Sequence, residues 1–518
     1  VSFFPVFSPK SAALMTVQSI AYERTMVTSP STTFDSTFSD LGNILEPLRS
    51  SWNSFESVII VKDLSWCGIE DLQKVLPSFK TIFKFDNATY RLNDGPFYED
   101  MPGFNPIVKT TPAVKALKIQ TSWDTAVNRL LENEQEHAMP SISMVCGTKN
   151  VGKSTFGRYL VNRLLNVHQR VAYLETDIGQ TEFTPSGMVS FHILDTPLLG
   201  PPFSHPHLKC KRSFFVGSTS PKNDATYYLD CIQQLVQTYR QESEAWVAIA
   251  EQDGDNSQRQ LLPLVVNIHG YVKGAGYDML MTMMKDIMPT HVFAFVNSPG
   301  VSNNTFNLPP DFTNNVMMMQ ESLPNRHLIH LQIPTNPTST TTISDQGQSL
   351  LPTRPQQWKA PPTTWADKYQ PIDHRQFMLI WWHTSTRLVE RIPWTIDWRT
   401  HLKGIWVLFD DVPVSQLLYA LNGSLVVGLI RSIDPENHRF YILTPLSIER
   451  LQLVTGLVKG DLELPLNCMF DKRDEYGNGV CDSPWRQVPY LSLDVVETAG
   501  SAAPRLRRNI MRKSQQME

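Results

Sequence analysis

Between residues 140 and 300, the hydrophobic and polar positions follow a strand-like pattern and a helix-like pattern in turn. Short apolar runs such as SISMVCG, VAYLETDIG and THVFAFVNS have the length of buried strands. Between them lie segments with apolar residues at helical spacing, among them STFGRYLVNRLLN and YDMLMTMMKDIM. Strands that alternate with helices predict a parallel sheet covered by helices on both faces. We therefore expect an α/β fold whose central domain spans residues 121–300, beginning with a helix in SWDTAVNRLLENEQEH.

The segments on either side of this domain have different patterns. Residues 1–120 carry short strand-like runs such as SVIIVKDL, broken by Ser, Pro, Gly and Asn, and predict a β-rich N-terminal domain. Residues 301–375 contain a stretch rich in Pro, Thr, Ser and Gln, which predicts an insertion that is either a plain linker or a functional lid. Residues 376–518 return to strand-like runs and predict an α+β C-terminal domain with a basic tail, which is either solvated or docks on RNA or a partner protein.

The composition narrows the class of protein. With 41% hydrophobic and 19% charged residues, the 518-residue chain has the composition of a globular protein. A formal charge of −4 argues against a general nucleic-acid coat protein but not against a local basic groove. Six cysteines without Cys-x-x-Cys spacing argue against a zinc ribbon or a disulfide scaffold and favour a reducing compartment. No apolar run is long enough to predict a membrane span. Because the chain begins with Val1, we expect it to be a piece of a longer protein, whose targeting segment could be missing.

The segment GTKNVGKS, residues 147–154, has the spacing of a phosphate-binding loop. It follows a predicted strand and precedes a predicted helix, so its backbone N–H groups would point at a bound anion. We expect Lys153 to contact the β and γ phosphates of ATP and the Ser154 hydroxyl to bind Mg²⁺. The residues of this loop expected to contact the nucleotide are Gly147, Thr148, Lys149, Asn150, Val151, Gly152, Lys153 and Ser154.

Phosphoryl transfer also requires an acidic residue near the loop, to hold Mg²⁺ or to act as a base. The next predicted strand is followed by candidates in ETDIGQTE, of which we favour Asp177 because the apolar strand gives way to Gly179 there. Glu175 is the alternative, and one of the two could simply cap a turn. No Asn-Lys-x-Asp motif follows, which argues against a GTPase and leaves a kinase or an ATP-driven motor.

Three further segments resemble the polynucleotide 5′-hydroxyl kinases, in the order in which that family has them. ETDIGQTEFTPSGMVS resembles the family's Asp-x-Gly-Gln segment and Pro-Gly clasp, FFVGSTSPKND its Gly-x-Thr-Ser-Pro loop, and VNIHGYVKGAGYDML its Asn-Thr-x-Gly-Trp-x-x-Gly-x-Gly segment. The resemblance is close from about residue 140 to 300 and looser in the C-terminal segments. Those segments and the long Pro/Thr-rich insertion resemble the ribosomal-RNA-processing branch (the Grc type), which is related to the kinase of the messenger-RNA cleavage factor.

The resemblance implies roles for individual residues. Lys153, Ser154 and Thr155 would hold ATP and Mg²⁺, and Asp177 would bind the metal and align, or deprotonate, the attacking 5′-hydroxyl. Arg375 would be the lid arginine, with Arg354, Arg387 and Arg391 as alternatives. The residues implied to contact RNA are Gln180, Thr184, Pro185, Ser186, Gly187, Ser218, Thr219 and Tyr271.

The sequence departs from the family at two of these places. Tyr271 stands where the family has a tryptophan that stacks on a base, and Ile268 and His269 replace a Thr and its neighbour. A tyrosine still offers a π face for stacking, although an ordinary packed aromatic is an equally good interpretation of Tyr271.

The resemblance implies an ATP-dependent kinase that phosphorylates the 5′-hydroxyl end of pre-ribosomal RNA cleaved in the second internal transcribed spacer. It also implies a HEPN-domain endoribonuclease partner and a location in the nucleus, in the nucleolus. Two alternatives belong to other classes, a P-loop ATPase remodelling factor and a nucleotide-bound scaffold that has lost catalysis. The clasp and the Ser-Thr loop argue against the first, and the presence of Lys153, Ser154 and Asp177 argues against the second.

Overall fold

The structure is a computed structural model of the 518-residue chain. It describes residues 6–15, 82–83, 116–137, 139–205, 210–253, 261–297, 308–309, 311–321, 329–335, 369, 371–385, 405–410, 426–434, 439–443 and 454–459. The predicted β-rich N-terminal domain therefore lies almost entirely outside the described residues. Within residues 1–120, the structure shows one parallel bridge, between Leu14 and Ala116.

A seven-stranded sheet forms the centre of the molecule, with the strand order β4-β3-β2-β5-β1-β6-β7. Strands β2, β5, β1, β6 and β7 are parallel, whereas β3 and β4 extend the sheet in antiparallel fashion. The strands are β1 (Ile142–Cys146), β2 (Val171–Glu175), β3 (Met188–Leu194), β4 (Cys210–Phe215), β5 (Leu264–Asn267), β6 (His291–Asn297) and β7 (Ile329–Thr335).

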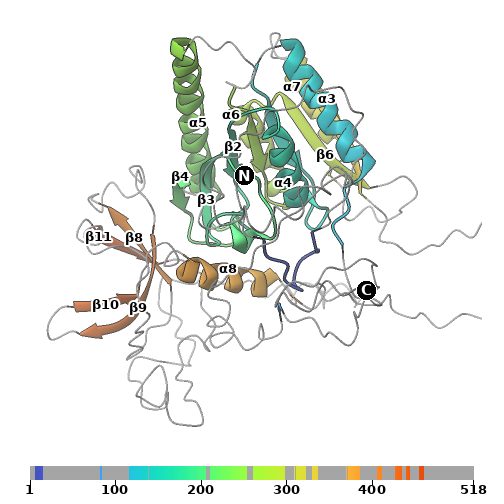
Figure 1. Ribbon diagram of the computed structural model, residues 1–518. Coiled ribbons are helices and arrows are strands. Elements are labelled where there is room, and N and C mark those ends of the chain that lie inside the picture. The colour runs from blue at the N-terminus through green and yellow to red at the C-terminus, as the bar shows by residue number, and fades with distance from the viewer. Residues whose placement is uncertain are drawn as a thin grey trace, which may run out of the picture.

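Helices cover both faces of this sheet, as the alternating pattern predicts (Figure 1). Successive residues of a strand point to opposite faces: Met144 belongs to one buried cluster, with residues of α5 and α6, and Val145 to the other, with residues of α3 and α4. The helices are α3 (Thr121–His137), α4 (Lys153–Leu164), α5 (Ala225–Asp253), α6 (Ala275–Ile287) and α7 (Phe312–Glu321). The predicted α/β class is confirmed. Within the described part of the chain, no helix combines the length and the apolar character that crossing a membrane requires.

The central sheet continues beyond the boundary expected at residue 300. Strand β7 pairs in parallel with β6, from His291 opposite Ile329 to Asn297 opposite Thr335. Residues 329–335 therefore belong to the central sheet, and the bounds of the domains stay a prediction. The Pro/Thr-rich composition of the surrounding region concealed the strand. Pro334 is tolerated within it because, among the described residues, β7 pairs only with β6.

The C-terminal region contributes a second, four-stranded antiparallel sheet with the order β10-β9-β8-β11. Its strands are β8 (Ile405–Asp410), β9 (Val426–Asp434), β10 (Arg439–Leu443) and β11 (Val454–Lys459). Helix α8 (Pro371–Ser385) precedes this sheet and packs on the short 3₁₀ helix η5 (Pro202–Ser204), where the rings of Phe377 and Phe203 lie 4.2 Å apart. Because α8 runs across residue 375, the boundary expected there falls inside a helix.

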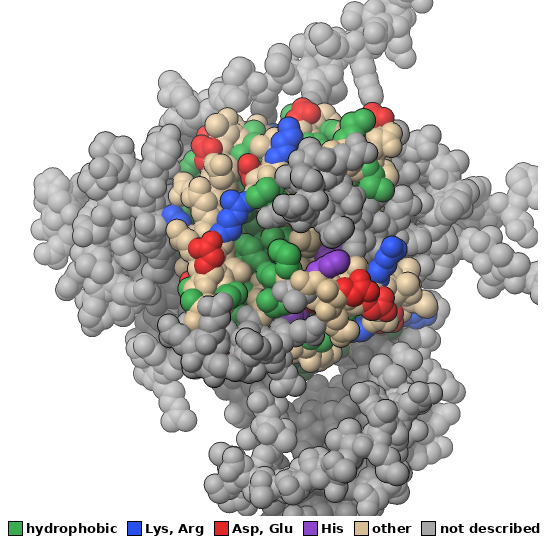
Figure 2. All heavy atoms as spheres, turned by 90° about the horizontal axis from the view of Figure 1, so that it is seen from above, with side chains coloured by type: hydrophobic (Ala, Val, Ile, Leu, Met, Phe, Trp, Pro, Cys, Tyr) green, Lys and Arg blue, Asp and Glu red, His purple; other side chains and the backbone are tan. Residues whose placement is uncertain are grey.

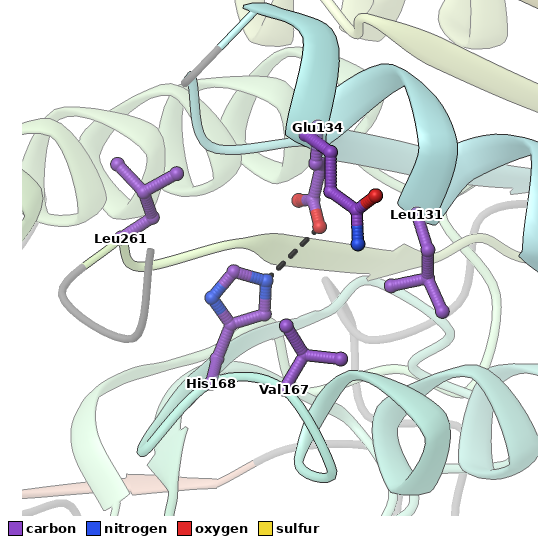
Figure 3. Close-up of a pocket in the computed structure, with 6 residues that line it drawn as sticks. Leu131, Glu134, Val167, His168 and Leu261 are labelled. Carbon is purple, nitrogen blue, oxygen red and sulfur yellow. Dashed lines mark hydrogen bonds and ion pairs between the residues drawn. The ribbon is translucent and has the colours of Figure 1, made fainter. Parts of the chain in front are cut away.

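The side of the sheet where the parallel strands begin and the side where they end carry different features. At the edge where the parallel strands begin, a small pocket is lined by Leu131, Glu134, Gln135, Val167, His168 and Leu261 (Figure 3). The described side chains seen from above mix charges of both signs around a hydrophobic patch (Figure 2). The predicted phosphate loop follows β1 and so lies at the opposite edge, where the parallel strands end.

Candidate active site

The predicted phosphate loop connects the buried strand β1 directly to helix α4. The strand ends at Cys146 and the helix begins at Lys153. Gly152, the residue before the helix, has a φ of 99°, a left-handed conformation that favours glycine. The first N–H groups of a helix have no acceptor within the helix. The loop therefore presents these donors at the carboxyl edge of the sheet, as anion binding requires.

Lys153 is held inside this loop, with only 7% of its surface exposed. Its Nζ donates a hydrogen bond to the carbonyl oxygen of Thr148 at 2.7 Å. Burial lowers the pKa of Lys153 to about 8, and the negative charge of Asp177 opposes that effect. The expected loop lysine and the expected acid are thus near enough for the charge of one to act on the other.

Asp177 follows strand β2 at the same edge and is half-buried. Its Oδ1 accepts hydrogen bonds from the backbone N–H groups of Gly179 at 2.9 Å and Gln180 at 3.1 Å. This turn fixes the direction of the Asp177 side chain. The side chain of Gln180 itself is exposed.

Glu175, the alternative acid, is fully buried and bound on several sides. Its Oε1 accepts the N–H of Asp177 at 2.8 Å and the side-chain amide of Asn267 at 3.0 Å, and its Oε2 accepts the N–H of Glu182 at 3.1 Å. Burial raises the pKa of Glu175 well above its usual range, which favours the neutral form. Glu175 therefore ties β2 to β5 and supports the loop that carries Asp177.

The expected clasp, residues 184–187, is buried in this conformation. The N–H of Gly187 donates to the carbonyl of Ile178 at 2.7 Å, and the Thr181 hydroxyl donates to the carbonyl of Thr184. The clasp is thereby folded back on the loop that carries Asp177. Pro185 and Ser186 share this burial, so the side chains expected to contact RNA here lie inside the protein.

A buried charged network, not anticipated from the sequence, anchors this clasp. Oε1 of Glu182 lies 3.4 Å from Nη1 of Arg158 and 2.9 Å from Nδ1 of His205. Burial alone would raise the pKa of Glu182, but Arg158 and His205 outweigh it and lower the pKa. The three residues are far apart in the sequence, so their interaction could not be predicted without the tertiary structure.

The loop after β4 carries Ser218 and Thr219 to the same place. The Ser218 hydroxyl accepts hydrogen bonds from the Asn223 side chain at 3.0 Å and from the N–H of Ser220 at 3.3 Å. A Cβ atom built on Gly179 would lie 3.0 Å from the Thr219 carbonyl oxygen. The Ser-Thr loop and the Asp177 turn are thus in direct contact.

Tyr271 lies in the loop between β5 and α6 and is half-buried. Its ring packs against Gly276, and Nζ of Lys222 lies 4.2 Å from the ring centroid. Its N–H donates to Nδ1 of His269 at 3.2 Å. The ring is therefore packed on one side and covered by a flexible cation on another.

Arg375 lies on α8, and its side chain is half-buried. Helix α8 reaches η5, and His205, which follows η5, contacts Glu182 of the clasp segment. Among the described residues, Arg375 makes no contact that places it on the phosphate loop. The alternatives Arg354, Arg387 and Arg391 lie outside the described residues.

The oxygen donors at this edge fit a hard cation held together with phosphate. Ser154 is in the first turn of α4, Asp177 supplies a carboxylate, and Oδ1 of Asn267 is buried with no hydrogen-bond partner among the described residues. Mg²⁺ takes one or two protein oxygens and completes its shell with phosphates and water. Among the described residues, no group of three or more His, Cys, Asp or Glu could hold a metal by itself. Chemically, the site can bind a nucleoside triphosphate beside a positioned carboxylate.

Several known proteins are similar in sequence to this chain. Residues 147–317 match the family described as "mRNA cleavage and polyadenylation factor CLP1 P-loop". The polynucleotide 5′-hydroxyl-kinase GRC3 of Cryptococcus neoformans is 28% identical over 99% of this chain and 71% of its own length. The polynucleotide 5′-hydroxyl-kinase NOL9 of Arabidopsis thaliana is 28% identical over 69% of this chain and 92% of its own length.

Among solved structures, the wild-type Clp1p–Pcf11p complex contains a chain similar to this one, with a TM-score of 0.44, 12% identity and coverage of 66% of this chain and 79% of that chain. The resemblance that the sequence motifs indicated, to polynucleotide 5′-hydroxyl kinases and to the P-loop of the cleavage factor, is confirmed by the curated relatives and the family match.

Proposed function

Because the chain is a relative, over most of its length, of the polynucleotide 5′-hydroxyl kinases named GRC3 and NOL9, we propose that it is an ATP-dependent kinase that phosphorylates the 5′-hydroxyl end of RNA. One observation carries the proposal beyond the family name. Asp177 lies near enough to the phosphate-loop Lys153 for its negative charge to favour the protonated lysine. The Ser-Thr loop touches the turn that holds Asp177. A phosphate donor and a nucleic-acid end would therefore meet at Asp177.

In the proposed reaction, the 5′-oxygen of the RNA forms a bond to the γ phosphorus of ATP while the bond between that phosphorus and the bridging oxygen breaks. The hydroxyl proton passes to the Asp177 carboxylate and ADP leaves. Lys153 and the N–H groups of the phosphate loop neutralise the charge that develops on the phosphoryl oxygens. Mg²⁺, held through Ser154 and Asp177, would supply further charge neutralisation when bound. Catalysis then consists of positioning and electrostatics, without a covalent enzyme intermediate.

The RNA end would be held by the segments that surround Asp177. Ser218 and Thr219 are proposed to contact the phosphate after the first nucleoside, which the contact of Thr219 with Gly179 supports. Gln180 is exposed beside them and is proposed to contact the RNA end or the metal. The clasp consists of Thr184, Pro185, Ser186 and Gly187. It would either support the loop that carries Asp177 or open to admit the terminal nucleotide. Tyr271 would stack on a base once Lys222 moves off its ring.

The finer biological role is also a proposal. The substrate would be pre-ribosomal RNA cut in the second internal transcribed spacer, the partner a HEPN-domain endoribonuclease, and the location the nucleus, in the nucleolus. Arg375 is proposed as the lid arginine, because a planar guanidinium suits the charge spread over a transferring phosphoryl group and because α8 is linked to the clasp through η5.

The test uses the full chain, γ-labelled ATP and an RNA oligonucleotide with a 5′-hydroxyl, with and without the proposed nuclease. We expect label on the RNA end, none on the same RNA already bearing a 5′-phosphate, and strong loss in Lys153→Ala and Asp177→Asn. Free phosphate released while the RNA stays unlabelled would instead establish an ATPase. Bound ATP without turnover in either arrangement would establish a nucleotide-bound scaffold.

A further inference from the structure

The middle strand β5 ends between the two halves of the candidate site. In the sheet it lies between β2, which leads to Asp177, and β1, which leads to the phosphate loop. Asn267 is its last residue, and Ile268, His269 and Gly270 follow. A Cβ atom built on Gly270 would lie 2.7 Å from the backbone nitrogen of Lys149. The residues after β5 are therefore packed directly against the phosphate loop.

His269 is buried in this position, with 3% of its surface exposed. Its Nδ1 accepts the hydrogen bond from the N–H of Tyr271 at 3.2 Å, so in the neutral ring the proton resides on Nε2. That Nε2 has no hydrogen-bond partner among the described residues and is closed off from solvent. A buried donor without a partner costs free energy, and such a group calls for an explanation.

The residues around the His269 ring indicate which kind of hydrogen-bond acceptor could reach its Nε2. The ring of Tyr228 lies 5.8 Å from that of His269, and the Tyr228 hydroxyl donates to the carbonyl of Thr176, the neighbour of Asp177. The next residue, Gly270, meets Lys149 of the phosphate loop. His269 is thus enclosed between the Asp177 loop and the phosphate loop.

The tautomer of the His269 ring follows from its one hydrogen bond. Because Nδ1 accepts the N–H of Tyr271, the ring carries its proton on Nε2 and offers it as a donor. A fixed donor of this kind pairs with an acceptor such as a phosphate oxygen. It does not suit a metal-bound water, whose lone pair is turned toward the metal.

We propose that the Nε2–H of His269 donates a hydrogen bond to the terminal phosphate of a bound nucleoside triphosphate and positions that phosphate for transfer. The inference rests on the nucleotide site of the proposed function. The contact between Gly270 and Lys149 favours the nucleotide over the RNA as the source of the phosphate, because it joins the His269 segment to the phosphate loop itself.

The chain offers a matched control in His291, the first residue of β6 at the opposite edge of the sheet. His291 is also buried, and its Nε2 also lacks a partner among the described residues. It differs from His269 in its distance along the strands from the nucleotide loop. A Phe substitution at either position removes the same donor from a similar environment.

The test compares binding of a non-hydrolysable ATP analogue with binding of ADP. For His269→Phe we expect the analogue to bind about ten-fold or more weakly while ADP binding changes little, because a hydrogen bond to a charged group is lost. His269→Gln keeps an N–H donor and should therefore restore much of the preference for the ATP analogue over ADP. His291→Phe should leave the ratio of the two affinities unchanged.

Two measurements keep the inference falsifiable. Equal weakening of analogue and ADP, or a change confined to the KM for RNA, would overturn it. If His269→Phe does not fold, histidine-selective ¹⁵N spectra of the wild-type chain replace it, and the Nε2 signal of His269 should shift with the ATP analogue but not with ADP. Phosphoryl transfer by the wild-type chain is measured in parallel, so that failure of this inference is distinguished from failure of the kinase proposal.

Discussion

Gly270 and Lys149 lie in van der Waals contact through their backbones, although 120 positions separate them in the sequence. A Cβ atom on Gly270 would come within 2.7 Å of the Lys149 nitrogen and 2.9 Å of its Cα. Because both atoms belong to the backbone, no side-chain rotation could relieve that clash. The middle strand and the phosphate loop are therefore fitted to each other, and the geometry of one depends on the other.

Gly270→Ala should displace the phosphate loop and weaken ATP binding by about ten-fold or more, measured by titration with a fluorescent nucleotide. Gly157→Ala is the matched control. Gly157 lies within α4, where an added Cβ would be 3.6 Å from the Tyr173 hydroxyl, an ordinary contact. That substitution should leave affinity unchanged and raise stability by about 0.5–1 kcal/mol. Unchanged affinity in Gly270→Ala would show that the loop adapts to the added atom.

The two carboxylates after β2 should respond differently to amide substitution. Asp177→Asn should lower the rate of phosphoryl transfer by about 100-fold or more, because it removes the proposed proton acceptor. Glu175→Gln should change the rate only a few-fold, since burial already favours the neutral form of Glu175. Single-turnover rates decide between them. An equal loss in both variants, with unfolding temperatures intact, would show that Glu175 takes part in the chemistry.

Nucleotide affinity should fall with rising pH above about 8. Burial lowers the pKa of Lys153 to about 8, so the free chain loses the charge that pairs with phosphate as the pH rises through that value. The dissociation constant for ATP should increase by up to about ten-fold per pH unit there. In Lys153→Met this dependence should disappear, because the titrating group is gone. A wild-type affinity that stays flat from pH 8 to 10 would contradict the assignment.

The same group affects the stability of the free chain in the opposite sense. Unfolded, Lys153 titrates near 10.5, so between about pH 8 and 10.5 the unfolded chain binds more protons than the folded one. The contribution of Lys153 to stability therefore rises with pH across that window. Denaturant titrations of wild type and Lys153→Met should diverge in this sense.

Stability should decrease as the pH falls from about 6.5 to 4. Burial lowers the pKa of His291 from 6.5 to about 4, and within this window the unfolded chain takes up the proton that the folded chain excludes. A shift of this size corresponds to roughly 3 kcal/mol lost by pH 4. His291→Phe should have a flatter stability profile in urea titrations over that range. A parallel profile would show that His291 is protonated in the folded chain.

The sequence by itself determined the features that depend on local spacing. The strand, the loop GTKNVGKS and the helix that follows are contiguous, so their residue types alone predicted a phosphate site at Lys153 and Ser154. Asp177 was predicted in the same way, because polar residues directly after a buried parallel strand emerge at the carboxyl edge of the sheet. Alternating periods also sufficed for the α/β class.

Only the tertiary structure decided the features that depend on which distant segments meet. Glu175 and Asp177 are two positions apart, and their sequence context could not say that Asn267 and the backbone of Glu182 would enclose the first and not the second. The strand beyond residue 300 became visible only through its pairing with β6. The same holds for His269. Its buried donor points to a ligand only because the strand order places it between the Asp177 loop and the phosphate loop. Burial and partnership are properties of the packed chain, and for these residues local sequence carries no record of them.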